Sequence, residues 1–170
     1  MTNNRRSYTI RHSALVALLL SVEASAQEWT QFPGPNGAGV SASRGVQVAW
    51  TEQDFRWRVA LPGEGHSQPV LWGDRIFVSG ARDEGRERLL TCLRKEDGKE
   101  LWTKKYRLSG FRKHDDNSFA SSTPVVDKDR VFAMFASTDH GLVKAWDHSG
   151  KELWSVDLGG FDGPFGPSIY

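Results

Sequence analysis

Two polar side chains, His66 and Asn117, stand at corresponding places in the chain and could form a ligand site. Each belongs to a polar stretch that leads into a short apolar segment beginning with Pro-Val, at Pro69 and at Pro124. An imidazole can donate, accept or transfer a proton, and a carboxamide donates and accepts hydrogen bonds. Either residue could instead cap its loop by bonding the local backbone. Both are therefore ligand-binding candidates, with loop capping as the alternative role.

Other groups capable of chemistry are few. His114, Asp115 and Asp116 are adjacent, but their spacing matches no common zinc or calcium pattern, so we expect a solvated loop and no metal site. Cys92 is the single cysteine, so no internal disulfide can form, and we expect a small core residue rather than a catalytic thiol. Phosphate-binding glycine loops, Gly-x-Ser-x-Gly and His-Glu-x-x-His are also missing from the sequence. We therefore predict no catalytic residue.

The elements that must position these residues repeat along the chain. Gly-Lys-Glu-Leu-Trp occurs at 98–102 and again at 150–154, and similar Pro-Val and Asp-Arg-Ile/Val-Phe segments precede both copies. A period of about fifty residues is typical of propellers and other repeat folds. Segments with strand composition lie at 69–72, 76–78, 89–93 and 100–104 in the first unit and at 124–126, 130–135, 142–146 and 152–156 in the second. Four antiparallel strands per repeat indicate an all-β chain with about two β-propeller blades.

Single strands are expected on both sides of the two blades. Residues 55–59 have the composition of the last strand of another blade, and residues 168–170 that of the first strand of the next. Because a closed propeller needs roughly four to eight blades, we expect an incomplete ring whose remaining blades lie beyond Tyr170. Residues 55–59 would then supply the outer strand of the last blade and protect its edge.

The end of the second unit carries a recognisable motif. Residues 145–154 resemble the tryptophan-docking motif of PQQ-like β-propeller repeats, and residues 29–37 and 61–70 are similar to the opening of secreted bacterial outer-membrane-assembly-like repeat proteins. The resemblance implies that a tryptophan from each outer strand packs between neighbouring blades, beside a turn formed by glycine and held by aspartate. The structural residues implied in this way are Trp57, Trp102, Trp154, Gly98, Gly150, Ala145 and Asp147.

The first unit departs from that motif at two positions. Cys92 occupies the place of Ala145, and Arg94 the place of Asp147. The resemblance extends to quinoprotein dehydrogenases, which hold PQQ beside calcium, often against a vicinal disulfide that a single cysteine cannot form. We therefore predict no cofactor. PQQ and calcium belong only to the alternative in which the full-length protein is a quinoprotein oxidoreductase.

The first 26 residues have the composition of a secretory signal peptide. Three arginines precede an apolar run at 14–20, and Ala24-Ser25-Ala26 forms a small-x-small cleavage site before Gln27. The apolar run is too short for a membrane span, which needs roughly 20 residues. We predict a periplasmic or extracellular protein cleaved near Ala26, with Sec and twin-arginine export both open. Residues 27–54 would form an N-terminal extension, and residues 55–170 the propeller repeats.

The charge of the chain narrows the classes of partner. The formal net charge is +1, and loss of residues 1–26 with their three Arg and one Glu would make it −1. Such a nearly neutral chain offers no electrostatic surface for nucleic acid. The leading prediction is a secreted, non-catalytic propeller that presents a binding surface to a protein or polymer partner. The alternatives are the N-terminal part of a PQQ-dependent oxidoreductase and a truncated product without its own activity.

Overall fold

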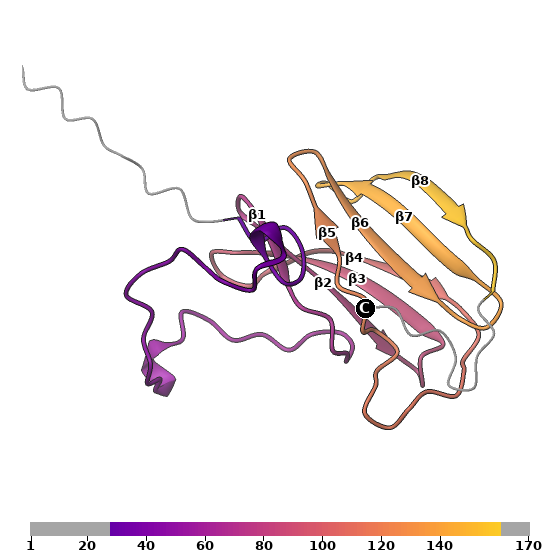
Figure 1. Cartoon of the computed structure of the whole chain (residues 1–170), viewed down its shortest axis with the longest axis horizontal. Coiled ribbons are helices and arrows are strands. Elements are labelled where there is room, and N and C mark those ends of the chain that lie inside the picture. Colours follow the sequence, from indigo (N-terminus) through magenta and orange to yellow (C-terminus); the bar gives the residue numbers. More distant parts are fainter. Residues whose placement is uncertain (1–27, 161–170) are drawn as a thin grey trace, which may run out of the picture.

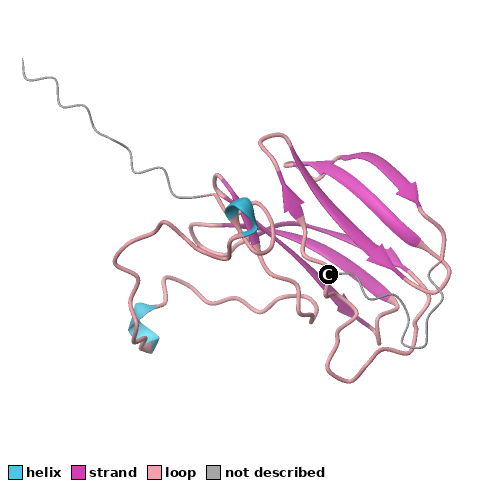
Figure 2. Ribbon diagram, viewed as in Figure 1, coloured by secondary structure: helices cyan, strands magenta, loops and turns pink. Residues whose placement is uncertain are grey.

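The computed structural model describes residues 28–160, which form two antiparallel β-sheets (Figure 1, Figure 2). The first sheet contains β1 (Val70–Trp72), β2 (Arg75–Arg82), β3 (Glu87–Arg94) and β4 (Glu100–Arg107), and the second contains β5 (Val125–Val126), β6 (Arg130–Ala136), β7 (Gly141–Asp147) and β8 (Glu152–Asp157). Within each four-stranded sheet the strands lie in chain order. Two short 3-10 helices, Pro35–Gly37 and Glu52–Asp54, precede β1. The predicted fold class, all-β with two four-stranded propeller blades and an unclosed ring, is confirmed.

Tight turns set the ends of the strands. The turns between the third and fourth strands contain Gly98 and Gly150, whose φ angles of 71° and 88° lie in the left-handed region that favours glycine. The turn between β5 and β6 has no glycine. There the Asp127 carboxylate accepts hydrogen bonds from the backbone N–H groups of Asp129 at 2.8 Å and Arg130 at 2.7 Å. These hydrogen bonds stabilise the turn in place of a glycine.

The repeated Gly-Lys-Glu-Leu-Trp phrase adopts the same local structure in both blades. After the glycine turn the fourth strand contains a β-bulge, in which the leucine is one residue more than its partner strand can pair. The tryptophan that follows lies opposite a small residue of the third strand. The pairs are Cys92 with Trp102 and Ala145 with Trp154, and the extra residues are Leu101 and Leu153. The phrase is therefore repeated because it specifies a turn, a bulge and a tryptophan position together.

The hydrophobic core lies between the facing surfaces of the two sheets. Phe77, Leu90 and Cys92 of the first blade belong to one buried cluster with Phe135 and Trp146 of the second. Desolvation in this cluster raises the pKa of the Cys92 thiol to about 12. The side chain therefore stays protonated at neutral pH and serves as a core residue, in the position that Ala145 holds in the second blade.

Residues 55–59, which we predicted as a strand, form no strand in the structure. A β-strand is defined by backbone hydrogen bonds to a neighbour, and within residues 28–160 no neighbouring strand is available to this segment. The segment has the composition of a strand, but strand pairing also depends on a partner. The second flanking strand, at 168–170, lies outside the described residues.

The beginning of the described chain joins the two sheets. The Trp29 carbonyl accepts the Leu71 N–H at 2.7 Å, and the Thr30 carbonyl accepts the Val126 N–H at 2.9 Å. The acceptors are consecutive residues, whereas the donors lie on the first strands of different blades. Figure 1 shows this segment passing beside β1. Within the described residues, no helix is long and apolar enough to cross a membrane.

Candidate functional site

Two adjacent hollows open beside the loops that lead into β1 and β5. The larger hollow has a volume of about 300 Å³ and the smaller about 170 Å³. His66 and Asn117 line both of them. The larger hollow is also lined by Glu64, Lys113 and Phe119, and the smaller by Phe32, Gln68, Asp116 and Thr123. The structure thus brings the two candidate residues of the sequence to one place, although they are separated by a full repeat.

The two loops that carry the candidates are bonded to each other. The His66 N–H donates to the Ser118 hydroxyl at 2.9 Å, and the Ser67 N–H donates to the Ala120 carbonyl at 2.9 Å. The loops also pack closely, because a Cβ atom at Gly65 would lie 2.7 Å from the Cβ of Ala120. These contacts fix the position of the His66 backbone relative to the second loop. The exposed imidazole is then free to meet a ligand.

His66 and Asn117 differ in how their side chains are used. The Asn117 side-chain oxygen accepts the Ser118 N–H at 2.8 Å, which is the local capping bond considered from the sequence. Its amide nitrogen makes no hydrogen bond with other residues of the described chain. The His66 ring likewise has no partner within residues 28–160. One amide donor group and one complete imidazole therefore face the hollows.

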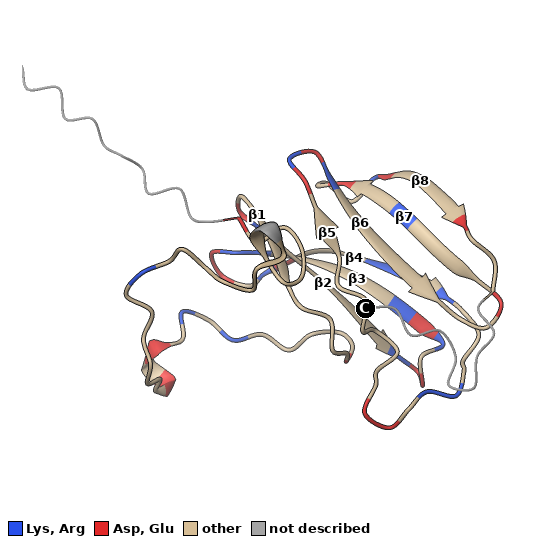
Figure 3. Cartoon of the chain, viewed as in Figure 1, with Lys and Arg blue, Asp and Glu red and all other residues tan. Residues whose placement is uncertain are grey.

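Charged groups of both signs surround these two side chains. Glu64 and Lys113 line the larger hollow, and the Lys113 ammonium lies 5.7 Å from the Phe119 ring centroid, within range of a cation–π contact. Asp116 lines the smaller hollow. Figure 3 shows acidic and basic residues close together in the loop between β4 and β5. The site therefore combines positive, negative and apolar groups. A site that attracts a polyanion would instead carry mainly positive charge.

The loop at 114–116 was expected to be solvated and without metal. His114 and Asp116 lie 3.4 Å apart, nitrogen to oxygen, and both are exposed. Among the described residues, no group of three His, Cys, Asp or Glu side chains is placed so that it could hold a metal ion.

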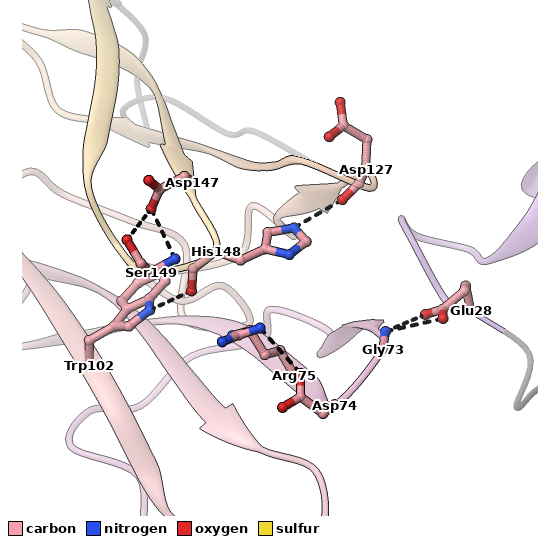
Figure 4. A network of polar contacts seen from close by, with 9 residues as sticks. All are labelled: Glu28, Gly73, Asp74, Arg75, Trp102, Asp127, Asp147, His148 and Ser149. Carbon is pink, nitrogen blue, oxygen red and sulfur yellow. Dashed lines mark hydrogen bonds and ion pairs between the residues drawn. The ribbon is translucent and has the colours of Figure 1, made fainter.

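Trp102 makes one of the contacts between the two blades (Figure 4). Its indole N–H donates to the His148 carbonyl at 3.1 Å, and a Cβ atom at Gly150 would lie 3.0 Å from its ring. The His148 ring in turn donates to the Asp127 carbonyl at 3.0 Å and packs against Phe77, with ring centroids 5.6 Å apart. Trp102 therefore docks on the turn of the following blade, and the absence of a side chain at Gly150 makes room for it.

Trp57 makes the same contact one repeat earlier. Its indole N–H donates to the Lys95 carbonyl at 3.0 Å, and a Cβ atom at Gly98 would lie 2.6 Å from its ring. Trp154 has the equivalent register but is 40% exposed, whereas the motif predicts a tryptophan buried between blades, as Trp102 is. The difference has a simple cause, since the described chain contains no further turn that could cover Trp154.

Aspartates hold the turns of both blades, but from different positions. Asp147 accepts the N–H of Ser149 at 2.9 Å and its hydroxyl at 2.6 Å. In the first blade Arg94 stands at that place, and Asp97 accepts the Arg94 Nε–H at 2.9 Å and the Lys99 N–H at 3.1 Å. These hydrogen bonds, led by Ser149 for Asp147 and by Arg94 for Asp97, hold the pKa of each carboxyl below its usual range. The sequence departure at Arg94 is therefore compensated three residues later.

A polar network between the blades was not predicted from the sequence. The Tyr106 hydroxyl donates to Glu152 at 2.8 Å and accepts the Trp146 indole N–H at 3.2 Å. The buried Lys144 ammonium lies 3.1 Å from the other Glu152 oxygen and 4.5 Å from the Tyr106 ring centroid. Burial is the main cause that raises the pKa of Tyr106 to about 12. The members come from three strands, so no local motif could have indicated the network.

Comparison with known proteins adds the family. A sequence profile described as outer membrane protein assembly factor BamB matches residues 27–162. Among solved structures, a europium-containing methanol dehydrogenase is similar over 53% of this chain and only 15% of its own, with 21% identical residues and a TM-score of 0.37. A comparison with curated protein sequences gave no match. The profile match covers most of the chain, and the chain therefore belongs to the PQQ-like propeller family described as outer membrane protein assembly factor BamB.

Proposed function

We propose that this chain is part of a secreted, non-catalytic propeller that binds a protein or polymer partner at the two hollows lined by His66 and Asn117. The observation that carries the proposal is that side chains from corresponding loops of consecutive repeats line the same two hollows. Loops that enter the first strand of a blade are where propellers usually carry specificity, since the sheets supply a rigid scaffold.

The chemical character of the hollows supports a role in recognition. Amide, imidazole, ammonium and carboxylate groups stand beside the Phe32 and Phe119 rings. Such a mixture of polar groups and aromatic surface is typical of interfaces with polar protein segments. The thiol of Cys92, which is the most nucleophilic type of side chain in the sequence, is buried in the core with a pKa of about 12. Its place in the fold supports packing rather than nucleophilic catalysis.

The family supports a periplasmic or extracellular location and a protein partner. Its description names the assembly of outer membrane proteins. We therefore favour a protein partner over another polymer, and a periplasmic or extracellular location reached through the signal peptide predicted at 1–26. The alternative of a truncated product without activity of its own would leave the hollows without a binding role.

PQQ and calcium are proposed not to bind to the residues described here. A ligand of the size of PQQ needs a mostly enclosing pocket with convergent polar groups. The larger hollow, of about 300 Å³, and an apolar hollow of about 320 Å³ beside Trp57 are both open to solvent. Calcium takes roughly six to eight oxygen ligands, and the Asp116 carboxylate already lies beside His114. The alternative role, as part of a PQQ-dependent oxidoreductase, would need the cofactor to be held by other parts of a longer protein.

Site-directed photo-crosslinking tests the binding role. A benzoylphenylalanine at position 66 is expected to give a discrete covalent adduct with a protein partner in cells that export the chain. The matched control places the same probe at Lys128, an exposed residue of the turn between β5 and β6. Adducts at both positions, or at neither, would contradict a partner site at the hollows. Tryptophan quenching by PQQ that depends on calcium would contradict the proposed lack of cofactor.

A further inference from the structure

Hydrogen-bond donors without acceptors gather at the larger of the two hollows. Its lining includes Lys113, Asn117 and Ser118 from the loop between β4 and β5, and His66 from the loop before β1. Within residues 28–160 the Lys113 ammonium has no carboxylate partner, and it lies 5.7 Å from the Phe119 ring centroid. The hollow therefore carries a cation and several neutral polar groups that are available to a ligand.

Existing hydrogen bonds restrict two of these groups to the role of donor. The Asn117 side-chain oxygen accepts the Ser118 N–H at 2.8 Å, which leaves the amide N–H groups for a ligand. The Ser118 hydroxyl oxygen accepts the N–H groups of His66 at 2.9 Å and Ala120 at 3.3 Å. Both lone pairs of that oxygen are thus in use, so the hydroxyl can act toward a ligand only as a donor. The complementary ligand is an acceptor.

The charges at the hollow select the kind of acceptor. Lys113 supplies one positive charge, whereas Glu64 lines the same hollow and pairs with no cation in the described part of the chain. Backbone hydrogen bonds in both directions between Glu64 and Ala81, at 2.9 and 2.8 Å, hold this acidic residue in place. Its charge disfavours a dianion such as phosphate, and its oxygens can accept an N–H group. A singly charged carboxylate attached to a peptide meets both conditions.

We propose that the larger hollow binds a carboxylate of a peptide, supplied either by an Asp or Glu side chain or by a C-terminus. Lys113, Asn117 and Ser118 would donate to its two oxygens, which together accept about four hydrogen bonds. The inference rests on the proposed function, because it names the group of the protein partner that the hollow holds. The hollow of about 300 Å³ has room for this group and part of an adjoining residue.

Nuclear magnetic resonance of the full 170-residue chain tests the ligand with three matched dipeptides. Acetyl-Asn-Phe has a terminal carboxylate, acetyl-Asp-Phe-amide has a side-chain carboxylate, and acetyl-Asn-Phe-amide has neither. We expect saturable shifts of the Asn117 side-chain N–H signals with at least one of the first two, and the tighter of them identifies the source. Inorganic phosphate at equal ionic strength should not displace it. Equal shifts with the third peptide, displacement by phosphate, or no shifts with the first two would overturn the proposal.

Two variants assign the donors. Asn117→Asp keeps the oxygen that accepts the Ser118 N–H but replaces the donating amide with a negative group, so the loop is retained while the peptide carboxylate is repelled. Lys113→Met removes the cation. Either change should weaken binding about tenfold or more, whereas Lys128→Met, in the exposed turn between β5 and β6, should leave it unchanged. Unchanged affinity in a folded Asn117→Asp chain would overturn the proposal.

Photo-crosslinking from position 66 separates this inference from the proposed function. An adduct that forms equally in the Asn117→Asp background, with no response to the carboxylate peptides, would keep the partner site and overturn the carboxylate. Carboxylate binding without any crosslinked partner would keep the inference about the ligand and contradict the proposed partner protein. Loss of the adduct in the Asn117→Asp background, together with the peptide shifts, supports both.

Discussion

Substitution of Gly98 by alanine tests whether the tryptophan-docking contact holds the first blade. The new Cβ atom would lie 2.6 Å from the Trp57 ring, and the φ of 71° is strained for a residue with a side chain. Gly73 is a matched control, because its φ of 58° carries the same backbone strain, while a Cβ atom there would meet nothing within 4 Å. The difference between Gly98→Ala and Gly73→Ala therefore isolates the contact with the indole.

The expected magnitudes follow from the two causes. The left-handed conformation costs a non-glycine residue about 1–2 kcal/mol, and this cost applies to both variants. Overpacking adds about 1–3 kcal/mol at Gly98 only. Displacing the indole would also break the hydrogen bond from Trp57 to the Lys95 carbonyl, which contributes about 1 kcal/mol. Gly98→Ala should therefore lower the free energy of unfolding by about 3–6 kcal/mol, against about 1–2 kcal/mol for Gly73→Ala.

Urea unfolding followed by circular dichroism measures these differences, and a double-mutant cycle identifies their source. In a Trp57→Leu background the indole is absent, so Gly98→Ala should cost no more than Gly73→Ala. The coupling between Trp57 and Gly98 should then account for the overpacking component. Equal penalties for the two glycine variants, or a Gly98→Ala penalty that is unchanged by Trp57→Leu, would refute the reasoning.

Three further predictions concern single groups. Lys144→Met removes the buried cation that pairs with Glu152 and should lower the urea midpoint, whereas Lys128→Met at an exposed turn should not; equal midpoints would show that the pair contributes nothing. Because the folded-state pKa of Asp147 lies below the usual value of 3.8, the stability that its bonds contribute should be complete above that value and be lost as the pH falls through the folded pKa. Asp147→Asn should make the free energy of unfolding, measured in urea between about pH 5 and 2.5, less dependent on pH. An unchanged pH dependence would contradict the assignment to Asp147. Cys92 should resist a thiol reagent until the chain unfolds, so rapid labelling of the native protein would contradict its burial.

The strands were predictable because their signals are local. Turn residues and β-branched or aromatic segments recur at the same places in both units, and the repeat supplied an independent check at each position. Residues 55–59 show the limit of this reasoning, since strand composition alone does not provide a pairing partner. The bonds from Trp29 and Thr30 to the two blades were equally inaccessible, because their partners lie far away in the sequence.

At the candidate site, too, some features could be predicted from the sequence and others could not. His66 and Asn117 could be placed beside each other because corresponding loops of adjacent repeats lie side by side in a propeller. The burial of Arg88, which lies on β3 and is only 1% exposed, could not be predicted, because it depends on two phenylalanines of the loop between β4 and β5 and on a carbonyl of the other blade. In the sequence Arg88 belongs to a run of alternating charges that indicates a solvated turn. Repeat symmetry therefore predicts positions, whereas the contacts of the loop between β4 and β5 are known only from the structure.

The segment at 28–30 also determines how the protein would respond to mechanical force. Besides its bonds to β1 and β5, its first residue accepts the Gly73 N–H with both carboxylate oxygens, at 3.0 and 3.1 Å (Figure 4). A pull applied through the N-terminus would load the first strands of both blades together. These short strands would detach before the longer outer strands bear any load. A tether for single-molecule or immobilisation work is therefore better attached to an outer strand than to the N-terminus.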